Sequence, residues 1–249
     1  MSRPIIDLNA DVGEGLNTDA ELMPFITSAN IACGYHAGNG ETIRRTIALC
    51  LEHNVAIGAH PSFADRGNFG RKEHDLPIDE IAGLIREQLH IMQNACDEMG
   101  AMLHHVKPHG ALYNLSARNT DVARTIAETV FAFNPGLFLY GLSGSHSVAE
   151  GVMAGLNTVA EVFADRTYQP DGSLTPRHQQ GALIEDGMQA LQQAWVLATE
   201  HRVQATGGSS IELIAESICL HGDGPHAVSF ARFIHQTFVS RGFIIQAPQ

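Results

Sequence analysis

Short runs of apolar or β-branched residues alternate with longer helical patterns along almost the whole chain. This alternation is typical of repeated βα units that build a parallel sheet. The runs predict seven strands, at Pro4–Asn9, Ala29–Cys33, Val55–Ala59, Met102–Lys107, Leu137–Leu142, Thr158–Ala164 and Ser217–His221.

Apolar residues recur at three- and four-residue steps between these strands, which predicts amphipathic helices. We expect helices at Glu41–His53, Pro77–Met99, Asp121–Phe131 and Gln180–Glu200, and a last one that starts at Gly224-Pro225. Three long segments that each follow a strand, 59–77, 108–119 and 165–180, are predicted to be irregular.

Seven βα units in 249 residues match the size of one (β/α) barrel, so we expect a single domain over residues 1–249. An open doubly wound sheet is the alternative. The barrel is favoured because no glycine-rich dinucleotide fingerprint follows the first strand. In such a barrel the loops after the strands form the active site.

Composition excludes several classes of protein. Lys and Arg number 15 against 27 Asp and Glu, a formal charge of −12, and no basic tract is present to bind nucleic acid. No apolar run reaches the roughly 18 to 20 residues of a membrane span, and the start of the chain has no signal-peptide core. The four cysteines are scattered, as in a reducing compartment, so we expect a cytoplasmic protein.

Familiar catalytic motifs are absent from the sequence. It contains no G-x-x-x-x-G-K-[ST] phosphate loop, no G-x-S-x-G nucleophile turn and no H-E-x-x-H helix. The chain therefore has no recognisable ATP site of its own and no acyl-serine chemistry.

Polar residues collect instead at the ends of the predicted strands. Strand alternation places Asp7, Asn9 and Asp11 on one face of the first strand, although Asp11 could also cap the turn that follows. His36 and His60 come after the second and third strands. Such recurrence at one topological position favours a functional site over isolated structural histidines.

The fourth strand places His105, Lys107 and His109 on one face. A lysine in a barrel mouth is expected to be desolvated, which lowers its pKa and suits it to acid/base work or to holding an anion. Further polar residues follow the sixth and seventh strands, where Asp223 could instead precede a helix cap: Asp165, Arg166, His221 and Asp223.

Carboxylate, imidazole and ammonium groups around a small polar pocket suffice for general acid/base hydrolysis, with or without a divalent metal. Four of the residues are chemically suitable metal ligands, but their spacing does not decide whether a metal binds: Asp11, His36, His60 and His221.

Six segments resemble the LamB/YcsF family, the A subunits of ATP-dependent 5-oxoprolinase. They are IDLNADVGEG, ANIACGYHAG, GAHPSFADRGNFGR, VKPHGALYN, EVFADRTYQPDGSLTPR and CLHGDGPHAV, and in this order they span roughly residues 5 to 228. The resemblance implies a seven-stranded deacetylase-like barrel. It also implies opening of the lactam of 5-oxo-L-proline to L-glutamate together with B and C subunits, with ATP consumed by the complex.

Motif position and strand-end chemistry supply the candidate roles within that activity. If the partner subunits phosphorylate the lactam oxygen, this barrel would direct water to the product and protonate the ring nitrogen. Asp11 or Asp165 would be the base and His60 or His221 the acid. The catalytic candidates are Asp11, His60, Lys107, Asp165 and His221, and the substrate-binding candidates are Asn9, His36, His109, Arg166 and Asp223.

Two other functions remain open at this point. One is a stand-alone metal-dependent amidohydrolase or deacetylase, which would work without ATP or partners. The other is a non-catalytic subunit that binds the lactam, in which substitution of Lys107 or Asp11 would change affinity without abolishing turnover.

Overall fold

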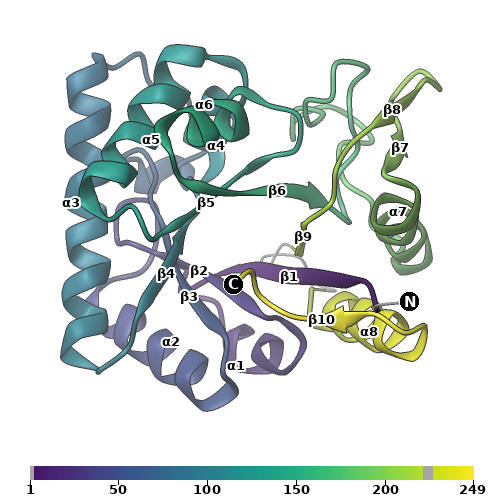
Figure 1. Cartoon of the computed structure of the whole chain (residues 1–249), viewed down its shortest axis with the longest axis horizontal. Helices are drawn as coiled ribbons and strands as arrows, with labels where there is room; N and C mark the ends of the chain where they lie inside the picture. The colour runs from purple at the N-terminus through teal and green to yellow at the C-terminus, as the bar shows by residue number, and fades with distance from the viewer. Residues whose placement is uncertain (1–2, 221–226) are drawn as a thin grey trace.

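The computed structural model describes residues 3–220 and 227–249. Seven parallel strands form a closed barrel in the order β1-β2-β3-β4-β5-β6-β9, because β9 pairs with both β6 and β1 (Figure 1). Closure confirms the predicted barrel and excludes the doubly wound sheet. The strands are β1 (Ile5–Val12), β2 (Ser28–Ala32), β3 (Ala56–His60), β4 (Leu103–Val106), β5 (Phe138–Leu142), β6 (Asn157–Phe163) and β9 (Ser217–Leu220).

Helices surround the barrel, and most of them follow a strand directly in the chain (Figure 1). They are α1 (Asp19–Leu22), α2 (Gly40–His53), α3 (Ile78–Glu98), α4 (Gly110–Arg118), α5 (Thr120–Phe133), α6 (His146–Ala154), α7 (Gly187–Glu200) and α8 (Ala227–Ser240), with 3₁₀ turns at Met23–Phe25 and Arg66–Asn68. The three helices predicted after the second, third and fourth strands are confirmed as α2, α3 and α5 to within about two residues.

Local chemistry explains these ends. Asn39 caps α2 by accepting hydrogen bonds from the backbone N–H groups of Glu41 and Thr42, and Asn54 ends it in the left-handed conformation.

Other predicted boundaries were wrong. Helix α7 begins at Gly187 rather than Gln180, because Leu183 pairs with Arg166 in an isolated β-bridge and is held outside the helix. The segment 108–119, predicted to be irregular, contains α4. Helices α1 and α6 were not predicted, nor were the hairpin of β7 (Arg202–Gln204) with β8 (Ser210–Glu212) and strand β10 (Ile244–Ile245). The predicted helix start at Gly224-Pro225 lies outside the described residues.

The interior of the barrel is polar. On β1, Ile6, Leu8 and Ala10 are buried in the hydrophobic layer, whereas Asp7 and Asn9 contact polar side chains of other strands. The predicted inward-facing polar ladder on β1 is therefore confirmed. Such groups are tolerated inside a protein only when they are hydrogen-bonded, and this requirement ties the strands to one another.

Candidate active site

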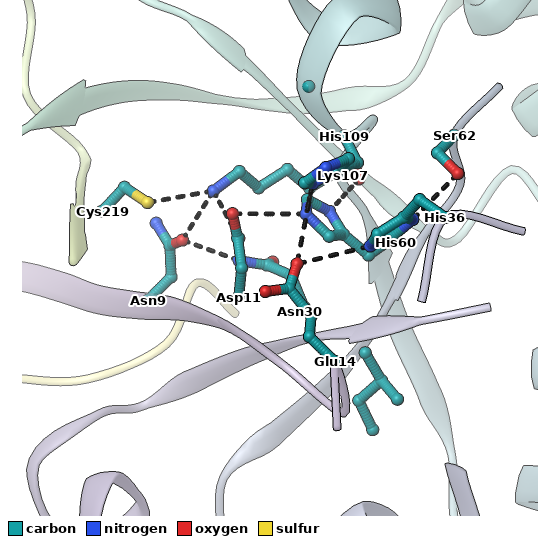
Figure 2. A network of polar contacts seen from close by, with 12 residues as sticks. Asn9, Asp11, Glu14, Asn30, His36, His60, Ser62, Lys107, His109 and Cys219 are labelled. Carbon is teal, nitrogen blue, oxygen red and sulfur yellow. Dashed lines mark hydrogen bonds and ion pairs between the residues drawn. The ribbon is translucent and has the colours of Figure 1, made fainter. Parts of the chain in front are cut away.

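The carboxyl ends of β1, β3 and β4 bring together an acid, two histidines and a lysine (Figure 2). Asp11 lies near the end of β1, His60 is the last residue of β3, and Lys107 and His109 follow β4. Glu14 joins them from the turn after β1. That turn is fastened by a hydrogen bond from the Gly13 N–H to Asp19 at 2.9 Å, so Asp19 performs the capping considered for Asp11.

The imidazoles of His60 and His109 face each other with their ring nitrogens 2.9 Å apart. His60 Nδ1 lies 2.7 Å from the carbonyl oxygen of Lys107, and His109 Nε2 lies 2.9 Å from that of Phe69. A carbonyl oxygen only accepts hydrogen bonds, so both of these nitrogens carry hydrogen. In neutral rings the facing atoms, His60 Nε2 and His109 Nδ1, therefore both present lone pairs.

Two carboxylates adjoin this pair of lone pairs. Asp11 Oδ2 lies 3.3 Å from His60 Nε2, and Glu14 Oε1 lies 3.8 Å from His109 Nδ1. One ligand atom from each of the four residues falls within 4.8 Å of the others. The Asp11 and Glu14 side chains are only 11% and 3% exposed, so these charges are largely removed from water.

His36 packs against this group without belonging to it. Its ring stacks on His109 with centroids 3.9 Å apart, Nδ1 bonds Ser62 Oγ at 2.8 Å, and Nε2 contacts Glu14 Oε1 at 3.3 Å. Burial, followed by the nearby His60, lowers the pKa of His36 to about 3. A neutral His36 at Glu14 holds that carboxylate in place through one hydrogen bond.

Lys107 forms the other half of the site (Figure 2). Its ammonium lies 3.0 Å from Asp11 Oδ1 and 2.7 Å from Glu161 Oε1, and it donates to Asn9 at 3.1 Å. Burial alone would lower the pKa of Lys107, but Asp11, Cys219 and Glu161 outweigh it and raise the pKa well above its usual value. The expected lowering was therefore wrong: this lysine is a fixed positive charge.

The remaining predicted site residues lie in three places: on β1, directly after β6, and outside the described residues. Asn9 is fully buried in the lysine network, and its side chain accepts from Asn30 and Lys107. Asp165 and Arg166 follow β6, and the Asp165 charge acts on the pKa of both Arg166 and Cys219. His221 and Asp223 lie outside the described residues.

Sequence reasoning missed Glu14, Asn30 and Glu161. Glu14 sits in the V-G-E-G segment, which was considered only as a turn, and Asn30 and Glu161 lie inside predicted strands where the pattern looks apolar. Cys219 is buried, as expected for all four cysteines, yet its Sγ lies 3.1 Å from Lys107 Nζ. The alternation on β2 and β6 could have shown that Asn30 and Glu161 face inward.

A cavity of about 880 Å³ is lined in part by Asp11, Glu14, His60, Lys107 and His109. Its wall runs from Asp11 and His60, past Lys107 and Phe163, to Arg166 and the start of α6. This volume is at the upper end of the ~300–1,000 Å³ usual for small-molecule sites. Among residues 3–220 and 227–249, no helix is long and apolar enough to span a membrane.

The closed barrel of seven parallel strands with its surrounding helices has the deacetylase-like (β/α)-barrel fold. The chain belongs to the LamB/YcsF family, whose model matches residues 6–249. It is 46% identical over 246 residues to the A subunit of 5-oxoprolinase from Oceanobacillus iheyensis, covering 97% of this chain and 96% of that protein.

Solved structures agree with this placement. The lactam utilization protein of Thermus thermophilus superimposes with a TM-score of 0.91 at 38% identity, covering 98% of this chain and 99% of that one. The catalytic domain of a peptidoglycan N-acetylglucosamine deacetylase from Eubacterium rectale shares the fold, with a TM-score of 0.56 at 12% identity over 100% of this chain and 90% of that one.

Proposed function

We propose that this chain is the catalytic A subunit of an ATP-dependent 5-oxoprolinase, a single-domain cytoplasmic enzyme that opens the lactam of 5-oxo-L-proline to give L-glutamate together with B and C subunits. The 46% identical relative of nearly equal length supports the activity and the existence of a multi-subunit complex. The absence of a phosphate-loop motif from the sequence supports ATP being handled by the partners.

The facing lone pairs of His60 and His109 are the observation that supports a bound metal ion. Two facing lone pairs repel each other unless a proton or a cation lies between the two nitrogens. A shared proton would remove this repulsion but would contact only the two rings. A divalent cation would also neutralise Asp11 and Glu14, and histidine ligands of metals usually donate their other N–H to a carbonyl or carboxylate, as both do here. We therefore assign these four residues as the ligands of a divalent ion such as Zn²⁺ or Mn²⁺.

Such an ion, when bound, polarises a carbonyl and lowers the pKa of a bound water. The residues around it supply position and charge. Lys107 holds Asp11 by an ion pair, and His36 holds Glu14. With Asp11 and His60 engaged as ligands, we assign the proton transfers to Asp165 and His221, and substrate contacts to Arg166 and Asp223. Asn9, which is fully buried, instead positions Lys107 by accepting its hydrogen bond.

Activity is tested by glutamate release from 5-oxoproline, measured for the purified chain alone and with B and C subunits, each with and without ATP. We expect release only in the complete mixture with ATP. Release by the chain alone, without ATP, would replace the proposal with the stand-alone amidohydrolase.

The cation is tested separately by calorimetric titration of chelator-stripped protein with Zn²⁺ and Mn²⁺. We expect one site, and His109→Ala should weaken it at least ~100-fold because a direct ligand is lost. His53→Ala, an exposed histidine at the end of α2, is the matched control and should leave the affinity unchanged. Failure of the wild-type chain to bind either ion at millimolar concentration would remove the metal from the proposal and leave the activity test standing.

A further inference from the structure

Arg166 also lines the wall of the cavity, together with residues of the segment that follows β6. Its guanidinium is buried, with only 4% of the residue exposed. Its Nε donates to the carbonyl of Ala182 at 3.3 Å and one terminal nitrogen donates to that of Thr175 at 2.6 Å. Both partners are neutral, and the charge of the neighbouring Asp165 also acts on Arg166.

A buried cation is costly unless negative charge lies close to it, and a bound anion would add to the charge that Asp165 supplies. Arg177 also lines the cavity, and burial together with Arg177 lowers the pKa of Arg166 to about 10, which leaves it charged at neutral pH. Asp171 on the same wall is engaged by the N–H and hydroxyl of Ser173.

The start of α6 lines the same cavity and offers hydrogen-bond donors. Ser145 precedes the helix, its Oγ is buried, and that atom has no hydrogen-bond partner within the described residues. Strands β5 and β6 are neighbours, so the segments that follow them adjoin. Gly144 and Gly172, from these two segments, both lie next to Leu213. Free N–H groups at a helix start favour a negative group.

We infer that Arg166, Ser145 and the first turn of α6 form an oxyanion-binding subsite of the cavity, separate from the group around Asp11. Its ligand is a group with several equivalent oxygens, such as a phosphoryl group or a carboxylate. Only the identity of that anion rests on the proposed function: an activated lactam would bring a phosphoryl group, and the lactam itself a carboxylate.

The test is titration of the chelator-stripped chain with inorganic phosphate, sulfate and acetate, followed by NMR or calorimetry, so that no metal competes for the anion. We expect saturable binding. Arg166→Gln should weaken it at least ~10-fold because a charge-assisted hydrogen bond is lost. Because Arg166 also holds backbone carbonyls, Ser145→Asp is the second variant. Its new negative charge should abolish binding, whereas Ser209→Asp, on an exposed loop, should not change it.

Comparison of the three anions shows which kind of ligand the subsite binds. Binding of phosphate and sulfate but not acetate supports a phosphoryl ligand, and equal binding of acetate supports a carboxylate. Absence of binding at tens of millimolar, or unchanged affinity in folded Arg166→Gln and Ser145→Asp, overturns the subsite. Because these readouts need neither partner subunits nor turnover, failure of the 5-oxoprolinase assay leaves them unaffected.

Discussion

Lys107 balances the charge of the site. Its ammonium lies between the carboxylates of Asp11 and Glu161, both of them largely or fully buried. Buried carboxylates are costly without an opposite charge close by, and the lysine supplies that charge to both of them. At the residue scale, the site is therefore a coupled set of charges, with a lysine between two carboxylates, rather than a set of independent acids and bases.

Lys107→Met therefore removes one partner of a buried ionic group. We expect a loss of about 3–5 kcal/mol in the free energy of unfolding and loss of glutamate release by the assembled complex. Lys72→Met, at an exposed lysine, should change stability by less than about 0.5 kcal/mol. Denaturant unfolding of both variants makes the comparison, and equal stabilities would contradict the assigned role of Lys107.

Site residues were predictable where they stood at the end of a recognisable strand. Asp11, His60 and Lys107 were found in this way, since parallel strands deliver their ends to one face of a barrel. Glu14 was missed because a glutamate between two glycines looks like part of a turn. The histidine pairing could not be predicted, because it depends on which backbone carbonyl each ring bonds, and sequence spacing does not encode that.

At the element scale, strands β3 and β4 approach each other through a glycine. Gly58 is aligned with His105, and a Cβ at Gly58 would lie 2.0 Å from His105 Nε2. That nitrogen bonds the side chain of Asn30, which in turn donates to Asp11. Because Gly58 has no side chain, His105 can pack closely against it. This packing aligns the hydrogen bonds that lead from His105 through Asn30 to Asp11 in the site.

Gly58→Ala is expected to displace His105 and to lower the free energy of unfolding by about 1–3 kcal/mol, because the core has no room for the added carbon. Gly83→Ala is the matched control. Gly83 lies within helix α3 with nothing near its missing Cβ, so alanine there should raise stability by about 0.4–1 kcal/mol. Opposite signs in thermal or denaturant unfolding are the expected result, and a neutral Gly58→Ala would show that His105 can move freely.

The strands were predicted well because buried parallel strands are short, nearly continuous apolar runs. Short elements held by tertiary contacts were not. Strand β10 spans only Ile244 and Ile245 and exists through its pairing with β1. Helix α4 follows Pro108 and begins at Gly110, which has positive φ, so its sequence resembles a loop. The apolar residues of 180–186 fit a helical pattern but belong to a β-bridged loop.

At the scale of the whole molecule, the candidate site and the stabilising contacts of the C-terminal strand lie at opposite ends of the barrel. The site lies at the carboxyl end of β1, whereas β10 pairs with Ile5 and Ile6 at its amino end (Figure 1). Five residue-to-residue steps of strand, from Ile6 to Asp11, separate the two by roughly 17 Å at ~3.3 Å per step. Barrels of this kind commonly place activity at one end and stabilising contacts at the other.

Deletion of residues 244–249 tests this separation. It removes the hydrogen bond from the Ile244 N–H to Pro4, the one from Gln246 to Ile6, and the contact of His104 with Pro248, at 2.8, 3.0 and 3.0 Å. Three hydrogen bonds at about 0.5–1.5 kcal/mol each amount to roughly 2–4 kcal/mol. At about 2–4 °C per kcal/mol, the Tm should fall by roughly 5–15 °C.

The same truncated chain should keep its affinity for Zn²⁺ or Mn²⁺, measured below its Tm, because none of the four proposed ligands contacts the deleted segment. A fall in Tm with unchanged cation affinity separates the two ends of the barrel. If the cation affinity falls together with the Tm, the geometry of the strand ends depends on closure of the whole barrel. The physical connection would then be the polar interior, where Asn9 of β1 donates hydrogen bonds to Glu161 of β6 and Ser217 of β9.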